Sequence, residues 1–356
     1  MTWIALADSA SSWTDPSLAP TGAGAMRQLM RGSLMVETRL SPDHRPQTLL
    51  GYERRHPWEG RLSLQALPGG GVVLIMALGE RVFHKVLPSP EDIRAEALRL
   101  TFSWDSAANW GRLTVEHPEG DRLTMVETPA PPPILREDIH LMIHHPELCA
   151  RDPDVIYFAV SDRIEPVGPA PSLMAGAPAM TADGPCPVEE LKPGMQVITR
   201  ERGAQPVLGV ISREVPAMGS FRPIRLHAPY LGLTEDVQVS PRQRLVIDGS
   251  VVEYLFGREQ VLVPAANLVN ERTGERISTG RTVRYHQVLL PQHDALLVAG
   301  AAFESLYIGR IRRDKTRLAA SLLARADAAR LPEHHRAGIQ ILKAFEAITL
   351  AEARAA

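Results

Sequence analysis

The stretch that decides the fold of the second half of the chain is residues 172–199, which read SLMAGAPAMTADGPCPVEELKPGMQVIT. Near the end of this stretch, Pro193 presets the backbone φ angle for a turn, and Gly194 permits the reversal that follows. Val197 and Thr199 then continue one side of an extended segment. The stretch therefore predicts a tight turn that leads into a short β-strand.

Three further segments accompany this one, and together the four resemble a Hint (Hedgehog/intein) self-processing domain. The opening stretch carries the family's pattern PVE-x-L-x-x-G-x-x-V after a small-residue turn. The later segments match a strand and turn, a short helix after a strand, and two strands with a reversal between them: 237–247 (VQVSPRQRLVI), 259–270 (EQVLVPAANLVN) and 282–309 (TVRYHQVLLPQHDALLVAGAAFESLYIG). Four ordered segments are far more specific than any single motif.

The resemblance implies a particular self-cleavage chemistry. In a Hint domain, a thiol at the first position attacks the carbonyl just before it, and a histidine assists by protonating the departing backbone nitrogen. At these positions this sequence has Ser172 and Gln243, whereas His293 matches a family histidine that remains. The resemblance also implies that the bond to be cut would be Pro171–Ser172.

The residues at these positions are poorly suited to that reaction. A serine hydroxyl needs an activating base, and the Gln243 amide forms hydrogen bonds but does not transfer protons near neutral pH. Because general acid–base assistance contributes roughly a hundred- to ten-thousand-fold, we expect a degenerate Hint domain without efficient self-cleavage. Ser172 then simply begins the domain, Gln243 bonds a backbone group in its turn, and His293 is a satisfied turn histidine.

Two alternatives remain for the chain's activity. One is autoproteolysis at Pro171–Ser172 through an N-to-O acyl shift onto Ser172, helped by His293. The other is carbohydrate binding by the N-terminal half. Cys186 lies well downstream of Ser172 and is better interpreted as a small apolar filler than as a displaced nucleophile. Our main expectation is a binding or scaffolding module rather than an enzyme.

The N-terminal half shows the alternating pattern of β-strands. Apolar and polar residues alternate in eight short segments, which predicts a β-sandwich or barrel. Residues 98–127 resemble the successive hairpins of concanavalin-like jelly rolls. We therefore expect a mainly β chain with an N-terminal β-sandwich, an all-β Hint-like domain and two C-terminal helices. The eight segments are 34–40, 48–53, 61–67, 72–78, 81–87, 98–104, 112–117 and 122–127.

Composition shifts along the chain suggest its domain limits. Small, polar, Pro- and Gly-rich residues open the sequence, and IEPVGPAP at 164–171 is typical of a linker. After Arg313, apolar residues recur at helical spacing. The predicted organisation is an irregular lead-in (1–25), a sandwich domain (26–164), a linker (165–171), a Hint-like domain (172–313) and C-terminal helices (314–356).

The charge and the cysteine content limit which partners and which cellular compartment we expect. The net charge is only −2, from 39 Lys and Arg against 41 Asp and Glu, which gives no electrostatic reason to expect nucleic acid. No apolar stretch approaches the roughly 20 residues of a membrane span, and the first residues lack a secretory signal pattern. The two cysteines fit a reducing compartment. We expect a protein or glycan partner, no cofactor, and a location in the cytoplasm or export without a signal peptide.

Two clusters in the N-terminal half could bind ligands. His140, His144 and Cys149 are zinc-type ligands, and the two histidines would share one helix face, although Pro146 interrupts the helix before the cysteine. We therefore favour surface histidines over a metal site. Tryptophans in strands more often pack in a core than stack on sugars, and the Asp/Asn spacing gives little support for calcium. The residues concerned are Trp58, Trp104 and Trp110 for sugar, and Asp105, Asn109 and Asp121 for calcium.

Overall fold

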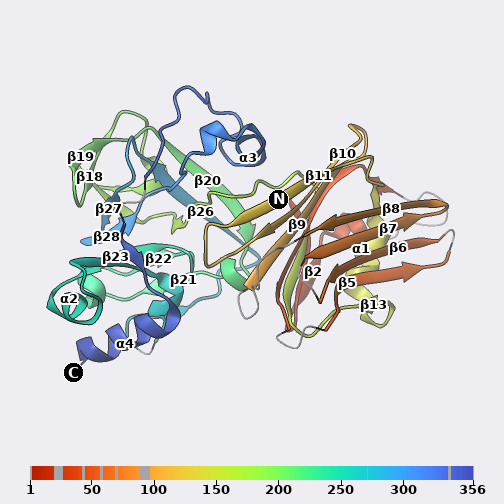
Figure 1. Ribbon diagram of the computed structural model, residues 1–356, viewed down its shortest axis with the longest axis horizontal. Coiled ribbons are helices and arrows are strands. Elements are labelled where there is room, and N and C mark those ends of the chain that lie inside the picture. Colours follow the sequence, from red (N-terminus) through yellow and green to blue (C-terminus); the bar gives the residue numbers. More distant parts are fainter. Residues whose placement is uncertain are drawn as a thin grey trace. The chain divides into compact units, whose positions relative to one another are not determined.

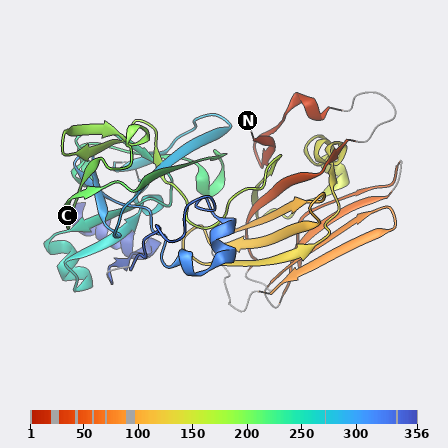
Figure 2. The same ribbon diagram turned by 90° about the horizontal axis from the view of Figure 1, so that it is seen from above.

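In the computed structural model of the protein, the chain forms two compact units, Met1–Val167 and Gly168–Ala356. The boundary between the units falls within the predicted linker, residues 165–171. Figures 1 and 2 show that each unit is built mainly from β-strands. The structure describes residues 2–19, 27–41, 45–56, 59–68, 71–88, 97–270, 272–335 and 338–355.

The first unit is a β-sandwich, as its alternating sequence predicts. Its two main sheets have the strand orders β11-β10-β9-β4-β14-β1-β2 and β13-β5-β6-β7-β8, and β3 pairs with β12. Each of the eight predicted segments forms a strand. The strands are β1 (Trp3–Asp8), β2 (Ser12–Thr14), β3 (Gln28–Leu29), β4 (Arg31–Arg39), β5 (Gln47–Arg54), β6 (Gly60–Ala66), β7 (Val72–Leu78), β8 (Arg81–Leu87), β9 (Ala97–Asp105), β10 (Trp110–Glu116), β11 (Leu123–Pro129), β12 (Ile134–Leu135), β13 (Cys149–Ala150) and β14 (Val155–Ser161).

Period-two alternation builds the core of this sandwich. Leu34 and Val36 on β4, with Leu100 and Phe102 on β9, point to one side of the seven-stranded sheet and are almost fully buried. They join apolar side chains of the five-stranded sheet, such as Leu64 on β6, in one hydrophobic cluster. Helix α1 (Arg136–His144) packs beside this cluster through its buried apolar residues. Burial of alternate residues therefore explains why the two sheets pack face to face.

The expected irregular lead-in is wrong for the first residues of the chain. Strand β1 pairs antiparallel with β14, and Trp3 and Leu6 on β1 are completely buried. The run WIALA is apolar throughout because both faces of this strand are covered, so it does not show the alternation of a half-buried strand. The polar composition further along the lead-in hid this short apolar run.

The second unit is also mainly β. Its sheets have the strand orders β20-β26-β15-β22-β21-β25 and β17-β16-β18-β27-β28-β23-β24-β29, with β19 beside β18. The strands are β15 (Leu173–Met174), β16 (Pro178–Thr181), β17 (Gly184–Pro187), β18 (Gln196–Thr199), β19 (Gly203–Pro206), β20 (Gly209–Pro216), β21 (Ile224–Leu226), β22 (Val237–Val239), β23 (Arg244–Asp248), β24 (Gln260–Pro264), β25 (Gly274–Arg276), β26 (Thr282–Leu289), β27 (Ala295–Val298), β28 (Ala301–Glu304) and β29 (Gln340–Ile341).

The predicted turn into a strand at 193–199 is present in this unit. Gly194 has a positive φ of 93°, a conformation that glycine adopts without steric strain. The amide of Gly194 donates a hydrogen bond to the carbonyl of Val207, and β18 begins two residues later. The helices of this unit are α2 (Ser250–Phe256), α3 (Lys315–Ala320) and α4 (Ala344–Ala355).

The two predicted C-terminal helices are present, but they cover less of residues 314–356 than expected. Asp314 caps α3 by accepting a hydrogen bond from the Arg317 amide, and the helix ends at Ala320. Before α4 begins, β29 pairs in parallel with β24. Apolar residues recur every three to four positions in this region partly because two helices form and partly because other residues, such as those of β29, pack onto the domain. None of the helices in the described part of the chain is long and apolar enough to cross a membrane.

Candidate functional site

Ser172 is held rigidly by the strands around it. It directly precedes β15, which lies between β22 and β26 in the six-stranded sheet. The amide of Ser172 donates to the His286 carbonyl at 3.3 Å, and its carbonyl accepts from the Ser240 amide at 2.7 Å. Only 6% of Ser172 is exposed. The backbone on both sides of the hydroxyl is therefore fixed by main-chain hydrogen bonds.

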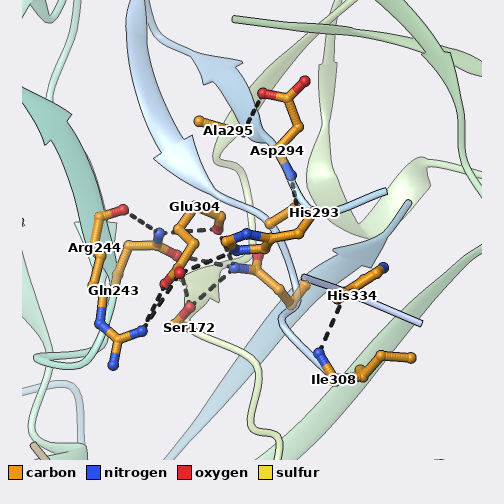
Figure 3. Close-up of polar contacts among 11 residues, drawn as sticks. Ser172, Gln243, Arg244, His293, Asp294, Ala295, Glu304, Ile308 and His334 are labelled. Atoms are coloured by element: carbon orange, nitrogen blue, oxygen red, sulfur yellow. Dashed lines mark hydrogen bonds and ion pairs between the residues drawn. The ribbon is translucent and has the colours of Figure 1, made fainter. Parts of the chain in front are cut away.

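The structure brings Ser172 and Gln243 together, although 71 positions separate them in the sequence. The Ser172 hydroxyl donates a hydrogen bond to Oε1 of Gln243 at 2.6 Å, and both side chains are buried. Nε2 of Gln243 donates to the Arg244 carbonyl at 2.8 Å and to the Glu304 carbonyl at 3.2 Å. Gln243 thus holds the serine hydroxyl on one side and the backbone of β28 on the other (Figure 3).

Gln287 is a third member of this cluster, which we did not predict. From β26, its Nε2 lies 3.2 Å from the Ser172 hydroxyl, 3.1 Å from Oε1 of Gln243 and 2.8 Å from the Glu304 carbonyl. The signal for it was a single amide beside the apolar run that ends β26, where side chains on both faces of the strand are buried. A polar residue in such a run needs a buried hydrogen-bond partner. We call Ser172, Gln243 and Gln287 the amide cluster.

His293 belongs to a charged group on the other side of Glu304. Its Nε2 lies 3.0 Å from Oε1 of Glu304, and Nη1 of Arg244 lies 3.1 Å from Oε2 of the same carboxylate. The side chains of all three residues are less than a tenth exposed. In the described part of the chain, no hydrogen bond joins His293 to Ser172. The surviving family histidine therefore contacts the Glu304 carboxylate and not the hydroxyl.

The arrangement gives the Ser172 hydroxyl no proton acceptor of useful strength. Its side-chain partners among the described residues are the two glutamine amides, which stay neutral and do not take up a proton near pH 7. A serine nucleophile depends on such a base because its hydroxyl is barely ionised. The amide cluster can orient the hydroxyl, but it cannot activate it.

Cys186 does not replace the missing thiol. It lies on β17, paired with Ala179 of β16, and its Sγ donates to the Pro187 carbonyl at 3.6 Å. Burial, together with the carboxylates of Glu190 and Glu189, raises the pKa of this thiol above its ordinary value. A raised pKa leaves less of the reactive thiolate. Cys186 is partly buried and packs against the hydrophobic core of the second unit.

The weak zinc candidates lie on two separate elements. On α1, the rings of His140 and His144 lie 4.2 Å apart, but Cys149 lies on β13 and its Sγ points to the Leu141 carbonyl at 3.9 Å. Burial raises the pKa of Cys149 to about 11, which disfavours the thiolate that binds zinc. No group of three metal-binding side chains occurs among residues that the structure describes. Pro146 begins a separate turn, as its position in the sequence suggested.

Of the three tryptophans considered for sugar binding, Trp104 and Trp110 lie in the described residues. Trp104 is completely buried, stacks on Phe102 and donates from Nε1 to the Leu29 carbonyl, so it is a core residue. Trp110 is half-buried with the Arg112 guanidinium over its ring, and Trp58 lies outside the described residues. Of the calcium candidates, Asp105 bonds the Ala108 amide and lies near Arg31. These contacts are those of a packed sandwich.

Comparisons with known proteins agree with the architecture of the second unit. The family model described as "Hint domain" matches residues 171–310. The chain is similar to a solved bacterial intein-like domain from Clostridium thermocellum at 14% identity and a TM-score of 0.28, covering 38% of this chain and 98% of that one. It is also similar to the Ruminococcus gnavus IT-sialidase CBM40 bound to alpha2,3 sialyllactose, at 13% identity and a TM-score of 0.29, covering 39% and 77%. No curated protein matches. The family match by itself identifies residues 171–310 as a Hint domain.

Proposed function

We propose that this Hint domain has kept its fold, has lost efficient self-cleavage, and serves the chain as a binding or scaffolding module. The observation that supports this proposal is the hydrogen bond from the Ser172 hydroxyl to the Gln243 amide oxygen at 2.6 Å. Where an active domain needs a group that moves protons, this chain has a neutral amide. General acid–base assistance of roughly a hundred- to ten-thousand-fold is therefore missing at the step that would form the ester.

The surroundings of the cluster fit a structural role. Gln243 and Gln287 both donate to the Glu304 carbonyl, so they join β23 and β26 to the end of β28. Each buried amide hydrogen bond stabilises a fold by about 0.5–1.5 kcal/mol, and an unmade one costs more. The hydrogen bonds that Gln243 and Gln287 form with the backbone therefore account for the presence of two amides beside Ser172.

Hydroxylamine distinguishes this proposal from autoproteolysis at Pro171–Ser172. If the acyl shift occurs, an ester forms at Ser172 and hydroxylamine cleaves it, giving fragments that end at Pro171 and begin at Ser172. We expect one intact mass after prolonged incubation with hydroxylamine at neutral pH. Fragments of those two masses that disappear in Ser172→Ala would establish the autoproteolytic alternative instead.

A further inference from the structure

Residues 331–335, which we call the strap, fold back onto the Hint domain from beyond the matched region. Leu331 is buried in a cluster of apolar side chains from β26, the loop after β28, and α3 with its flanking turns, and His334 is only 2% exposed. The amide of His334 donates to the Gly309 carbonyl at 2.9 Å. The strap therefore has a defined seat on the loop that follows β28.

The imidazole of His334 forms hydrogen bonds through both ring nitrogens. Nε2 lies 3.0 Å from the Leu290 carbonyl, and because a carbonyl only accepts, this nitrogen carries the hydrogen. Nδ1 accepts from the Ile308 amide at 3.4 Å, so it must be unprotonated. Only the neutral Nε2–H form of the ring satisfies both partners. A second proton on Nδ1 would point at the Ile308 amide hydrogen.

Burial and the neighbouring His293 ring disfavour a positive charge on His334. The ring of His293 lies 6.0 Å away and that of Tyr307 6.3 Å away, and Figure 3 shows His334 beside His293. Burial lowers the pKa of His334 below its ordinary value of 6.5. The Leu290 carbonyl opposes this, His293 adds to it, and the Leu306 carbonyl opposes it more weakly.

No carboxylate near the strap is placed to stabilise a protonated His334 ring among the residues that the structure describes. The neighbouring carboxylate, Glu333, contacts arginines of the turn at residues 310–313. Arg312 Nε lies 2.7 Å from this carboxylate, Arg313 Nη2 lies 2.6 Å from it, and Arg310 Nε lies 4.0 Å from it. Glu304 contacts His293 and Arg244, and His335 is exposed. The local carboxylates are therefore already paired with other cations.

We propose that His334 is a pH-sensitive latch, which fixes the strap to the Hint domain while its ring is neutral and releases it when Nδ1 is protonated. Protonation replaces an acceptor with a donor opposite the Ile308 amide, so that contact is lost and a charge remains at a buried site. The folded form favours the neutral ring, so the latch contributes its full stability above pH 6.5. That stability is lost as the pH falls below 6.5. This inference does not depend on the loss of self-cleavage.

Hydrogen–deuterium exchange on the full chain at pH 7.5 and pH 5.0 tests the latch, with rates corrected for intrinsic exchange. We expect protection at residues 306–309 and 331–335 to fall at pH 5.0, by up to tenfold for each pKa unit that His334 lies below 6.5. Strands β5 and β6 of the first unit should keep the same protection at both pH values. Equal protection of the strap at both pH values would contradict the proposal.

Two variants separate the latch from general acid sensitivity. In His334→Gln the amide can accept from Ile308 and donate to Leu290 without titrating, so we expect strap protection that no longer depends on pH. His335→Gln, the exposed neighbour, should keep the full response. If His334→Gln retains the response, the latch is refuted. The wild-type His334 ring, followed by NMR, gives a test that requires no variant: we expect a midpoint below pH 6.5, and a midpoint at or above it contradicts the proposal.

Discussion

Two buried polar clusters, one in each unit, differ in a way that bears on function. In the sandwich, Glu37 on β4 stands directly opposite Arg99 on β9, with Nη2 of Arg99 3.2 Å from Oε2 of Glu37 and both side chains at most 1% exposed. In the Hint domain, the amide cluster consists of uncharged side chains: Ser172 just before β15, Gln243 just before β23, and Gln287 on β26.

The contrast shows that buried charge by itself does not mark a reaction centre. Glu37 and Arg99 are explained by the sheet, because opposite charges on directly paired residues attract each other across two strands. The amide cluster, by comparison, lies where we propose that a self-cleaving domain would need its nucleophile and its assisting histidine. Beside it, Arg244 and His293 contact the Glu304 carboxylate, so the uncharged side chains are those that contact the Ser172 hydroxyl itself.

Restoring a nucleophile and a base at the amide cluster should have the largest effect. We expect Ser172→Cys combined with Gln243→His to cleave at Pro171 in the presence of a small thiol, because an imidazole then replaces the amide oxygen beside the nucleophile. The rate should exceed that of Ser172→Cys alone by roughly a hundred- to ten-thousand-fold. The time course of fragment formation by intact mass measures both. Equal rates for the two variants would mean that Gln243 does not occupy the position of the base.

Removing one member of the charged pair should strongly destabilise the sandwich. We expect Arg99→Met to lower the free energy of unfolding of the first unit by about 3–5 kcal/mol, since Glu37 loses the cation beside it in a buried site. Denaturant titration followed by tryptophan fluorescence measures the change. Arg61→Met is the matched control, because Arg61 and Glu53 form an exposed pair at 3.3 Å and its loss should cost less than about 1 kcal/mol. Similar losses of unfolding free energy in Arg99→Met and Arg61→Met would mean that the buried pair contributes no more to stability than the exposed pair.

Deleting an amide should have a smaller effect, confined to the Hint domain. Gln287→Ala leaves the Ser172 hydroxyl, the Gln243 amide oxygen and the Glu304 carbonyl without one donor. We expect a loss of about 1–3 kcal/mol in the unfolding of the second unit and no self-cleavage. Gln196→Ala, on the exposed side of β18, should change stability by less than about 0.5 kcal/mol. A stability loss in Gln287→Ala no larger than in this control would show that the cluster is not structural.

The sequence predicted strands better than it predicted the site. The eight alternating segments became strands because the apolar face of each sheet packs against the other sheet. On β4 and β9 the alternate polar side chains are buried as well. Strand β1 escaped prediction because both of its faces are covered. Ser172 and Gln243 were identified through ordered segments, but nothing local to Gln287 or His334 shows which distant strand each one meets. Those contacts depend on how β15, β23 and β26 converge.

The central claim is tested most directly by the wild-type chain itself, incubated at neutral pH and followed by intact mass spectrometry over several days. Because the Ser172 hydroxyl bonds to neutral amides, we predict a single species with the mass of all 356 residues throughout. Steady accumulation of a fragment that ends at Pro171, together with its complement beginning at Ser172, would contradict the account.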